Sequence, residues 1–298
     1  MTPFRLGTRG SPLALIQAEM VRDALAIDCE IVVVKTTGDK VQDRALAEIG
    51  GKALWTKELD RALLAGEIDA AVHSMKDVET IRPEMIAIAA VLPRADVCDR
   101  LVGADSIDAL RPGAVIGTSS PRRAAQMRKL RPDVKTVLFR GNVDTRLAKL
   151  AAGEADATLL AAAGLARLGR HDVGVEIPTN VMLPAPAQGA VGIECRADDN
   201  RARELLAAID DPQTHACILA ERAFLAELEA DCHSPVAALA VIQGAILTLS
   251  AELLSEDGAH SVHGQIEGAP TDHEVPRALA RELLGRAPPE IARLFAGA

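Results

Sequence analysis

The sequence predicts an α/β protein with two related α/β domains, whose sheets are mainly parallel, and a small C-terminal α+β domain with an antiparallel sheet. Three observations predict this fold class. Apolar runs typical of buried strands alternate with helical patterns through the first two hundred residues. One strand–turn–helix motif occurs twice in the sequence. After about residue 212, the alternation of strands and helices gives way to one helix followed by strand-like segments with turn residues between them.

The individual elements follow from hydrophobic periodicity. Continuous apolar runs predict strands at 29–35, 68–74, 85–92, 114–120, 134–139, 157–163 and 189–195. Helical spacing predicts one helix with an apolar face of Leu13, Ile16, Met20 and Ala24, and another near 56–66 with Leu59, Ala62 and Leu63 on one face. This alternation predicts crossover connections between parallel strands.

The repeated motif supports two related domains. LGTRGSPLALIQ begins at residue 6 and IGTSSPRRAAQM at residue 116. In both, a strand end and Gly-Thr precede a serine suited to the helix N-cap and a proline suited to the first helical position. Each helix start then offers unpaired N–H groups to an anion.

The domain boundaries follow from two segments that each end a block of elements: 92–100, and 178–190, which has three prolines and no helical period. The chain is expected to leave a first domain, build a second and return. We therefore predict domain 1 at 1–92 and 190–210, domain 2 at 96–184, and a C-terminal domain at 213–298. The last is expected to hold a helix at 214–229, three meandering strands and a helical segment at 272–295.

Composition argues against several classes of protein. A net charge of −9 and 2% aromatic residues do not fit a nucleic-acid-binding surface. The five cysteines are scattered, without disulfide or zinc spacing, so no structural metal is expected. No apolar run is long enough for a membrane span, and no secretory pattern marks the N-terminus, so a cytosolic location is expected.

An arginine group is the first candidate for chemistry. Arg122 and Arg123 fall in the first turn of a helix, where cations oppose the helix dipole. Further cations follow at predicted strand ends or helix starts: Arg9, Arg140, Arg146 and Arg167. Ligands of open α/β sheets bind at the carboxyl ends of strands, and guanidinium groups suit carboxylates. The placement favours an anionic ligand over a solvated basic face.

Three other stretches are weaker candidates. Lys76 and Asp77 follow an apolar run, where an ionised carboxylate could stabilise a cation or move a proton, or simply lie in a surface turn. GGKALWTKELD places Lys52 and Lys57 around Trp55 in a flexible loop, which is either a lid over an anion or an ordinary loop. Cys232 is either a small buried thiol or a reactive group.

Taken together, the motifs resemble the porphobilinogen deaminase family. The resemblance rests on TRGSPLAL with Gln17, GGKALWTKEL, AVHSMKDV, GTSSPRR, FRGNVDTRL, GLARLG, PAQGAVGIECR and the late cysteine loop, all in order. It implies two periplasmic-binding-protein-like domains and a cofactor-anchoring third domain. The implied enzyme is a monomeric transferase, hydroxymethylbilane synthase, which joins four porphobilinogen molecules head to tail with loss of ammonia and releases hydroxymethylbilane by hydrolysis.

The resemblance also assigns roles to residues. Cys232 is implied to hold a dipyrromethane cofactor through a thioether. Asp77 is implied to be catalytic, stabilising the positive azafulvene formed when ammonia leaves. Implied cofactor contacts are Lys76, Asp77, Thr118, Ser119, Ser120, Arg122, Arg123 and Arg146. Implied substrate contacts are Arg9, Ser11, Gln17, Lys52, Trp55, Lys57, Arg140, Arg146 and Arg167.

Two departures leave alternatives open. The family commonly has glycine directly before the cysteine, whereas this chain has Ala230 and Asp231, and Asp231 would disfavour the thiolate. The glycine-leucine-phenylalanine of the family's mobile loop is Ala53-Leu54-Trp55 here. The alternatives are a non-catalytic two-domain anion-binding protein, which would not need Asp77 or Cys232, and an inactive deaminase homologue.

Overall fold

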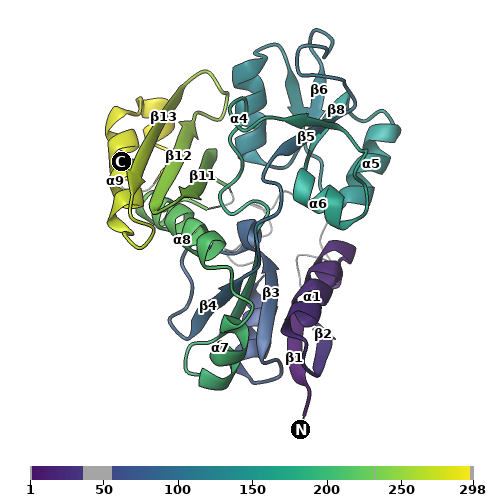
Figure 1. Cartoon of the computed structure of the whole chain (residues 1–298). Helices are drawn as coiled ribbons and strands as arrows, with labels where there is room; N and C mark the ends of the chain where they lie inside the picture. Colours follow the sequence, from purple (N-terminus) through teal and green to yellow (C-terminus); the bar gives the residue numbers. More distant parts are fainter. Residues whose placement is uncertain (1, 36–55, 232, 296–298) are drawn as a thin grey trace. The chain divides into compact units, whose positions relative to one another are not determined.

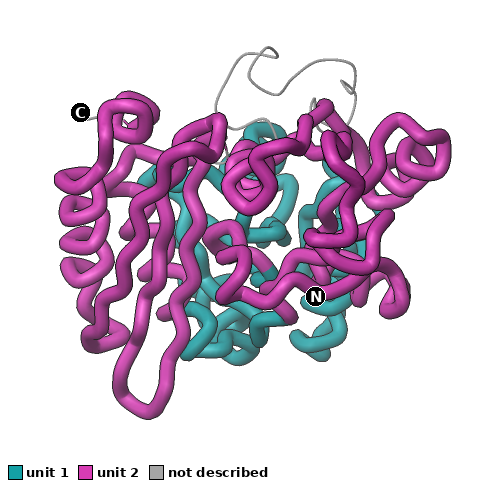
Figure 2. Tube along the Cα trace, turned by 90° about the horizontal axis from the view of Figure 1, so that it is seen from above, with its two compact units in different colours: residues 1–95, 189–215 teal, residues 96–188, 216–298 magenta. Residues whose placement is uncertain are grey.

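The structure is a computed structural model that describes residues 2–35, 56–231 and 233–295. Its chain divides into two compact units, which Figure 2 colours separately. Unit 1 comprises residues 1–95 and 189–215, and unit 2 comprises 96–188 and 216–298. Unit 1 comes from two separate stretches of the chain, and unit 2 contains both the predicted second domain and the predicted C-terminal domain. The predicted domain boundaries stay predictions.

Unit 1 is built on a five-stranded sheet in the order β2-β1-β3-β10-β4. Its strands are β1 (Phe4–Thr8), β2 (Cys29–Val33), β3 (Ala70–Ser74), β4 (Ile86–Val91) and β10 (Val191–Arg196). The first three are parallel, and β10 is antiparallel to both β3 and β4. Four strands therefore run in one direction, as the mainly parallel prediction expects.

The sheet of unit 2 repeats this arrangement, in the order β7-β6-β8-β5-β9. Its strands are β5 (Asp99–Val102), β6 (Val115–Gly117), β7 (Lys135–Val137), β8 (Ala157–Ala161) and β9 (Val175–Ile177). Only β5 is reversed against its neighbours in this sheet. Both reversed strands, β5 and β10, directly follow a crossing segment. The shared order confirms the internal repeat predicted from the sequence.

The two repeated helices begin as predicted. Ser11 caps α1 (Pro12–Leu25) and Ser120 caps α4 (Pro121–Leu130), each accepting a hydrogen bond from a backbone N–H three residues on. The predicted apolar face of α1 is wrong, since the buried residues are Gln17, Ala18, Val21 and Leu25. Gln17 is buried although it is polar, because its side chain forms a hydrogen bond with Ser74. The buried face of α1 therefore lies one position along the chain from the predicted face.

The other helices lie beside the same sheets (Figure 1). In unit 1 they are α3 (Lys57–Leu64) and α7 (Asn200–Ala207). The buried face of α3 consists of Leu59, Ala62 and Leu63, as predicted. In unit 2 they are α5 (Val143–Ala151), capped by Asn142, and the short α6 (Ala162–Arg167).

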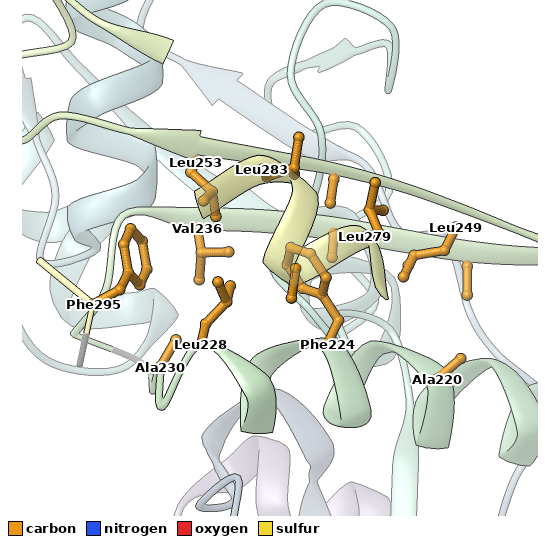
Figure 3. Packing of buried hydrophobic residues seen from close by; sticks show 14 of the residues in the cluster. Ala220, Phe224, Leu228, Ala230, Val236, Leu249, Leu253, Leu279, Leu283 and Phe295 are labelled. Atoms are coloured by element: carbon orange, nitrogen blue, oxygen red, sulfur yellow. The ribbon is translucent and has the colours of Figure 1, made fainter. Parts of the chain in front are cut away.

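The C-terminal part begins with α8 (Pro212–Glu227) and contains the predicted meander. Its strands are β11 (Val236–Gln243), β12 (Ile246–Leu254) and β13 (Ser261–Gly268), each antiparallel to the next. Figure 3 shows Phe224 of α8 and Leu228, which follows the end of that helix, pointing into a cluster with Leu249 and Leu279. This part therefore has its own apolar core.

The predicted final helical segment is two helices, α9 (Glu274–Arg286) and α10 (Pro289–Ala292). The break falls at Pro288 and Pro289, because proline has no backbone N–H to continue the ladder. No helix in the described part of the chain is both long and apolar enough to cross a membrane.

The C-terminal sheet is fixed to α4 within unit 2. Glu252 of β12 accepts a hydrogen bond from Gln126 at 3.2 Å and forms an ion pair with Lys129. A Cβ on Gly258, whose φ is +73°, would lie 2.4 Å from the Ala125 carbonyl oxygen. This close approach requires glycine. Helix α4 thus connects the C-terminal sheet to the sheet of unit 2.

Candidate active site

In unit 1, candidate residues gather at the carboxyl end of β1 and the start of α1. Ser11 holds the helix start, its Oγ accepting from the Ala14 N–H at 3.3 Å. Arg9 is half-buried just before it. The Gln17 side chain, 2% exposed, donates to the Ser74 Oγ at 2.8 Å and so joins α1 to the end of β3.

Lys76 and Asp77 lie in a single 3₁₀ turn, Met75–Asp77, directly after β3. The turn is held on β10, since the Met75 N–H donates to the Ala190 carbonyl at 3.1 Å. The Met75 side chain lies against Gly192, where a Cβ would be 2.1 Å from its Sδ. Lys76 and Asp77 are both half-buried. The predicted loop is therefore a short ordered turn on a fixed support.

A buried carboxylate, Glu194 of β10, lies at the base of this turn. His73 Nε2 is 3.2 Å from its Oε2, and Arg82 Nε is 2.8 Å from its Oε1. Burial by itself raises the pKa of the Glu194 carboxyl, but His73 and Arg82 outweigh burial and lower the pKa to about 2. Glu194 is therefore ionised at neutral pH although it is fully buried.

In unit 2, two segments run side by side beyond the ends of β6 and β7. The Thr118 N–H donates to the Val137 carbonyl at 2.9 Å, and the Phe139 N–H donates to the Thr118 carbonyl at 3.4 Å. The Phe139 ring lies against Gly117, where a Cβ would be 2.4 Å from its Cδ2. This pairing brings Ser119 and Ser120 beside the segment that continues to Arg140.

Arg140 is the clearest anion-binding candidate. It is only 8% exposed, and no residue in the described ranges accepts a hydrogen bond from its buried Nη1. A buried cationic donor without an acceptor is costly, which favours a ligand anion at this point. Arg146 extends the same edge, with Nη2 donating to the Ser119 Oγ at 3.3 Å. Arg167 ends α6, and burial lowers the pKa of its guanidinium.

Arg122 and Arg123 have an anion in front of them, but it belongs to the protein. Arg122 Nη2 lies 2.8 Å from Asp99 Oδ2, and Arg123 Nη2 lies 2.6 Å from Asp99 Oδ1. Burial raises the pKa of the Asp99 carboxyl, but the charges of the two arginines outweigh it and hold the pKa far below its usual range. Two guanidinium groups on one carboxylate still leave a surplus positive charge. Their contact with a ligand stays a prediction.

Some predicted site residues cannot be placed. Cys232, Lys52 and Trp55 lie outside the described residues. Lys57 is the first residue of α3 and is exposed. Beside Cys232, Asp231 accepts a hydrogen bond from the His233 N–H at 2.8 Å.

Three charged residues that were not predicted from the sequence form the buried ion pairs at these sites: Arg82, Asp99 and Glu194. Arg82 and Glu194 are 112 residues apart in the chain, and Asp99 is 23 residues from Arg122. One signal was present, because Glu194 interrupts an apolar run that predicts a buried strand. A charge in such a run requires a partner.

One group of possible metal ligands occurs in the described part of the chain: Asp96, Cys98 and Glu176. Burial and, second, the Asp96 charge raise the pKa of the Cys98 thiol to about 12. Two of the three residues are exposed at the surface, where acidic groups commonly gather without an ion, so we assign no metal site to this group.

Comparison with known families matches nearly the whole chain. Residues 4–204 match the family model described as porphobilinogen deaminase, dipyromethane cofactor binding domain. Residues 215–285 match the porphobilinogen deaminase C-terminal domain.

Two curated relatives match nearly the whole chain under the same family name. A porphobilinogen deaminase of Sphingopyxis alaskensis is 59% identical over 99% of this chain and 97% of its own length. One of Paracoccus denitrificans is 52% identical over 96% and 95%. Among solved structures, the periplasmic VFT2 domain of Bordetella pertussis BvgS is 14% identical with a TM-score of 0.41, over 69% of this chain and 86% of that one.

Proposed function

The chain belongs to the porphobilinogen deaminase family, and from that premise we propose which residues bind the cofactor, which bind the substrate and which is catalytic. The activity is the stepwise condensation of four porphobilinogen molecules with loss of ammonia, followed by hydrolysis to hydroxymethylbilane. The cofactor is a dipyrromethane. From the family resemblance we also propose that the protein is a hydroxymethylbilane synthase that acts as a monomer in the cytosol.

The buried Nη1 of Arg140, which has no acceptor among the described residues, is the observation that carries the assignment of unit 2. Each pyrrole unit of the substrate carries carboxylate groups, which are suited to guanidinium and hydroxyl donors. We propose that Arg140, Arg146 and Arg167 bind substrate carboxylates at the carboxyl edge of the unit 2 sheet. Ser119 and Ser120 lie at the same edge, where Ser119 already accepts from Arg146 at 3.3 Å.

The same edge fits the cofactor, whose carboxylates match the donors present there. The residues of unit 2 that would hold it are Thr118, Ser119, Ser120, Arg122, Arg123 and Arg146, with Cys232 as the covalent anchor. Lys76 and Asp77 of unit 1 are further cofactor contacts that the family resemblance implies. When bound, the cofactor supplies the pyrrole end onto which substrate units are joined. The Arg122–Asp99–Arg123 group supports this role, because its surplus positive charge attracts an anion to this edge.

In unit 1 we propose that Asp77 is the catalytic carboxylate. It is half-buried in a turn fixed on β10, so its position is set before substrate arrives. A fixed carboxylate stabilises the positive charge that develops on the substrate as ammonia leaves, and it can accept or return a proton. Arg9, Ser11 and Gln17, with Lys52, Trp55 and Lys57, are proposed substrate contacts.

The test is the intact mass of the purified, denatured protein, with a digest that covers residues 222–241. An added mass of two linked pyrrole units on Cys232 supports both the anchor and the activity. An unmodified protein that gains this adduct when incubated with porphobilinogen supports an apo-enzyme. A protein that never gains it is an inactive homologue or an anion-binding protein. Cys232→Ser is the matched variant, and cofactor attached to it would refute the anchor.

A further inference from the structure

A buried ionic cluster joins the residues just before and just after the turn that carries Lys76 and Asp77. We call this cluster the Glu194 clamp; its members are Thr56, Asp60, His73, Glu79, Arg82 and Glu194. His73 precedes the turn in β3, and Glu79 and Arg82 follow it before β4. The clamp therefore holds both ends of the segment that contains Asp77.

Glu194 is the point where the two ends meet. From before the turn, His73 Nε2 comes within 3.2 Å of Glu194 Oε2. From after the turn, Arg82 donates twice, with Nε 2.8 Å from Oε1 and Nη2 2.8 Å from Oε2. One carboxylate of β10 thus fixes the spacing between residues that lie on either side of Asp77.

Arg82 also ties the turn to helix α3. Its Nη2 donates to Asp60 Oδ1 at 2.6 Å, and its Nη1 donates to Glu79 Oε2 at 2.8 Å. The Thr56 Oγ1 donates to the same Glu79 oxygen at 2.7 Å. The planar guanidinium reaches the three carboxylates from three separate nitrogens, whereas lysine would offer its three donors from one nitrogen.

The charges show that Arg82 holds these groups together. Three carboxylates surround one guanidinium whose side chain is 9% exposed. Burial lowers the pKa of Arg82, but Glu194 and Asp60 outweigh burial and raise it above its usual value. Without Arg82, these carboxylates would repel one another in a place with little access to water.

We propose that Arg82 is a positioning residue that sets the place of Asp77 relative to β3, β10 and α3. This inference rests on the proposed catalytic role of Asp77. Arg82 acts only through the turn, and it need not touch substrate. Its effect on rate follows from geometry, since a misplacement of about 1 Å at a reacting group lowers rates about 100-fold.

The test compares holoenzyme variants. Arg82→Lys keeps a cation but loses the fork, and Arg82→Met combined with Glu194→Gln removes the central charges together. We expect kcat to fall roughly 10- to 100-fold in both, with KM changed less than about threefold. Hydrogen exchange of the Met75 and Val78 amides, which bond Ala190 and Met75, should become faster.

Arg5→Met is the matched control. Arg5 also forms a two-point pair in unit 1, with Nε 3.1 Å and Nη2 2.7 Å from the Asp69 oxygens. That pair does not involve the Asp77 turn, so kcat and the exchange of the Met75 and Val78 amides should stay near the original values.

Three results would overturn the inference. The first is an unchanged kcat in Arg82→Lys when exchange at the turn is faster. The second is a loss of kcat that matches only the fraction of unfolded protein. The third is an equal loss in Arg5→Met. Asp77→Asn, measured in parallel, separates the two proposals, because its retention of turnover would reject the role of Asp77 itself.

Discussion

In unit 1, buried Glu194 shares one guanidinium with two further carboxylates, whereas in unit 2 buried Asp99 lies alone between two guanidinium groups. The two carboxylates belong to β10 and β5, the reversed strands that occupy the same place in two sheets of the same order. The architecture is thus repeated, while the balance of charge around its buried acid is inverted.

The opposite charge balance around the two buried acids matches the roles that we propose for the two units. A carboxylate surplus lies beneath the turn of Asp77, where positive charge is proposed to develop on the substrate. A guanidinium surplus lies in the unit that carries Arg140 and Arg146, where carboxylates are proposed to bind. One strand arrangement thus carries a local field of opposite sign in the two units, because a few buried side chains set that sign.

The largest expected effect tests the acidic half. Asp77→Asn keeps the shape of the side chain but removes its charge, so kcat should fall at least about 1,000-fold, or about 4 kcal/mol. KM should change little. Steady-state kinetics on the folded variant provide the measurement, and near-normal turnover would remove Asp77 from the proposed mechanism.

The next effect tests the basic half through stability. Asp99→Asn leaves Arg122 and Arg123 buried without their anion, which should lower the free energy of unfolding by about 3 kcal/mol. Denaturant unfolding measures this change. Glu282→Gln, which removes an exposed ion pair with Arg286, is the control and should change stability by under about 0.5 kcal/mol. Equal losses in both variants would contradict the central role of Asp99.

Arg140→Met should separate binding from stability in that same half. Loss of a charge-assisted contact with the substrate should raise KM by about 30-fold, or about 2 kcal/mol. Stability should stay equal or rise, because a buried donor without a described acceptor is removed. The result that would contradict a ligand role is an unchanged KM together with a loss of stability.

The smallest expected effect is a pH dependence in unit 1. The folded-state pKa of Glu194 is lowered to about 2 from an ordinary 4.5, so its stabilisation is fully present above pH 4.5 and is lost as the pH falls toward 2. The loss should be on the order of 1 kcal/mol at pH 4. The free energy of unfolding is measured against pH for the original protein and for Glu194→Gln, and the difference between the two curves is the contribution of Glu194. Identical pH dependence in both proteins would contradict this contribution.

The sequence was sufficient for most elements and for the repeat. Apolar runs predicted most of the strands, and Ser-Pro pairs predicted both helix starts, because these signals are local. The short strands β5 and β9 were missed, because charged residues interrupt their apolar pattern. It was not sufficient for the face of α1, where buried Gln17 interrupts the apolar period. The break between the two final helices was overlooked although Pro288 and Pro289 are a local signal for it.

The candidate sites were predicted as residue types rather than as contacts. The sequence favoured an anion in front of Arg122 and Arg123, but the partner in the structure, Asp99, comes from another strand. Arg82 was missed because its partners in β10 and α3 are distant in the chain. Long-range ion pairs leave no period in a sequence.

The reversed strand β10 has a consequence for synthesis of the chain. Strands β3 and β4 do not pair with each other, and β10 lies between them. The ribosome makes β10 only after all five strands of the unit 2 sheet, which end at Ile177. We therefore expect unit 2 to complete its sheet first, while β3 and β4 wait with unpaired edges that are open to misassociation and to chaperones.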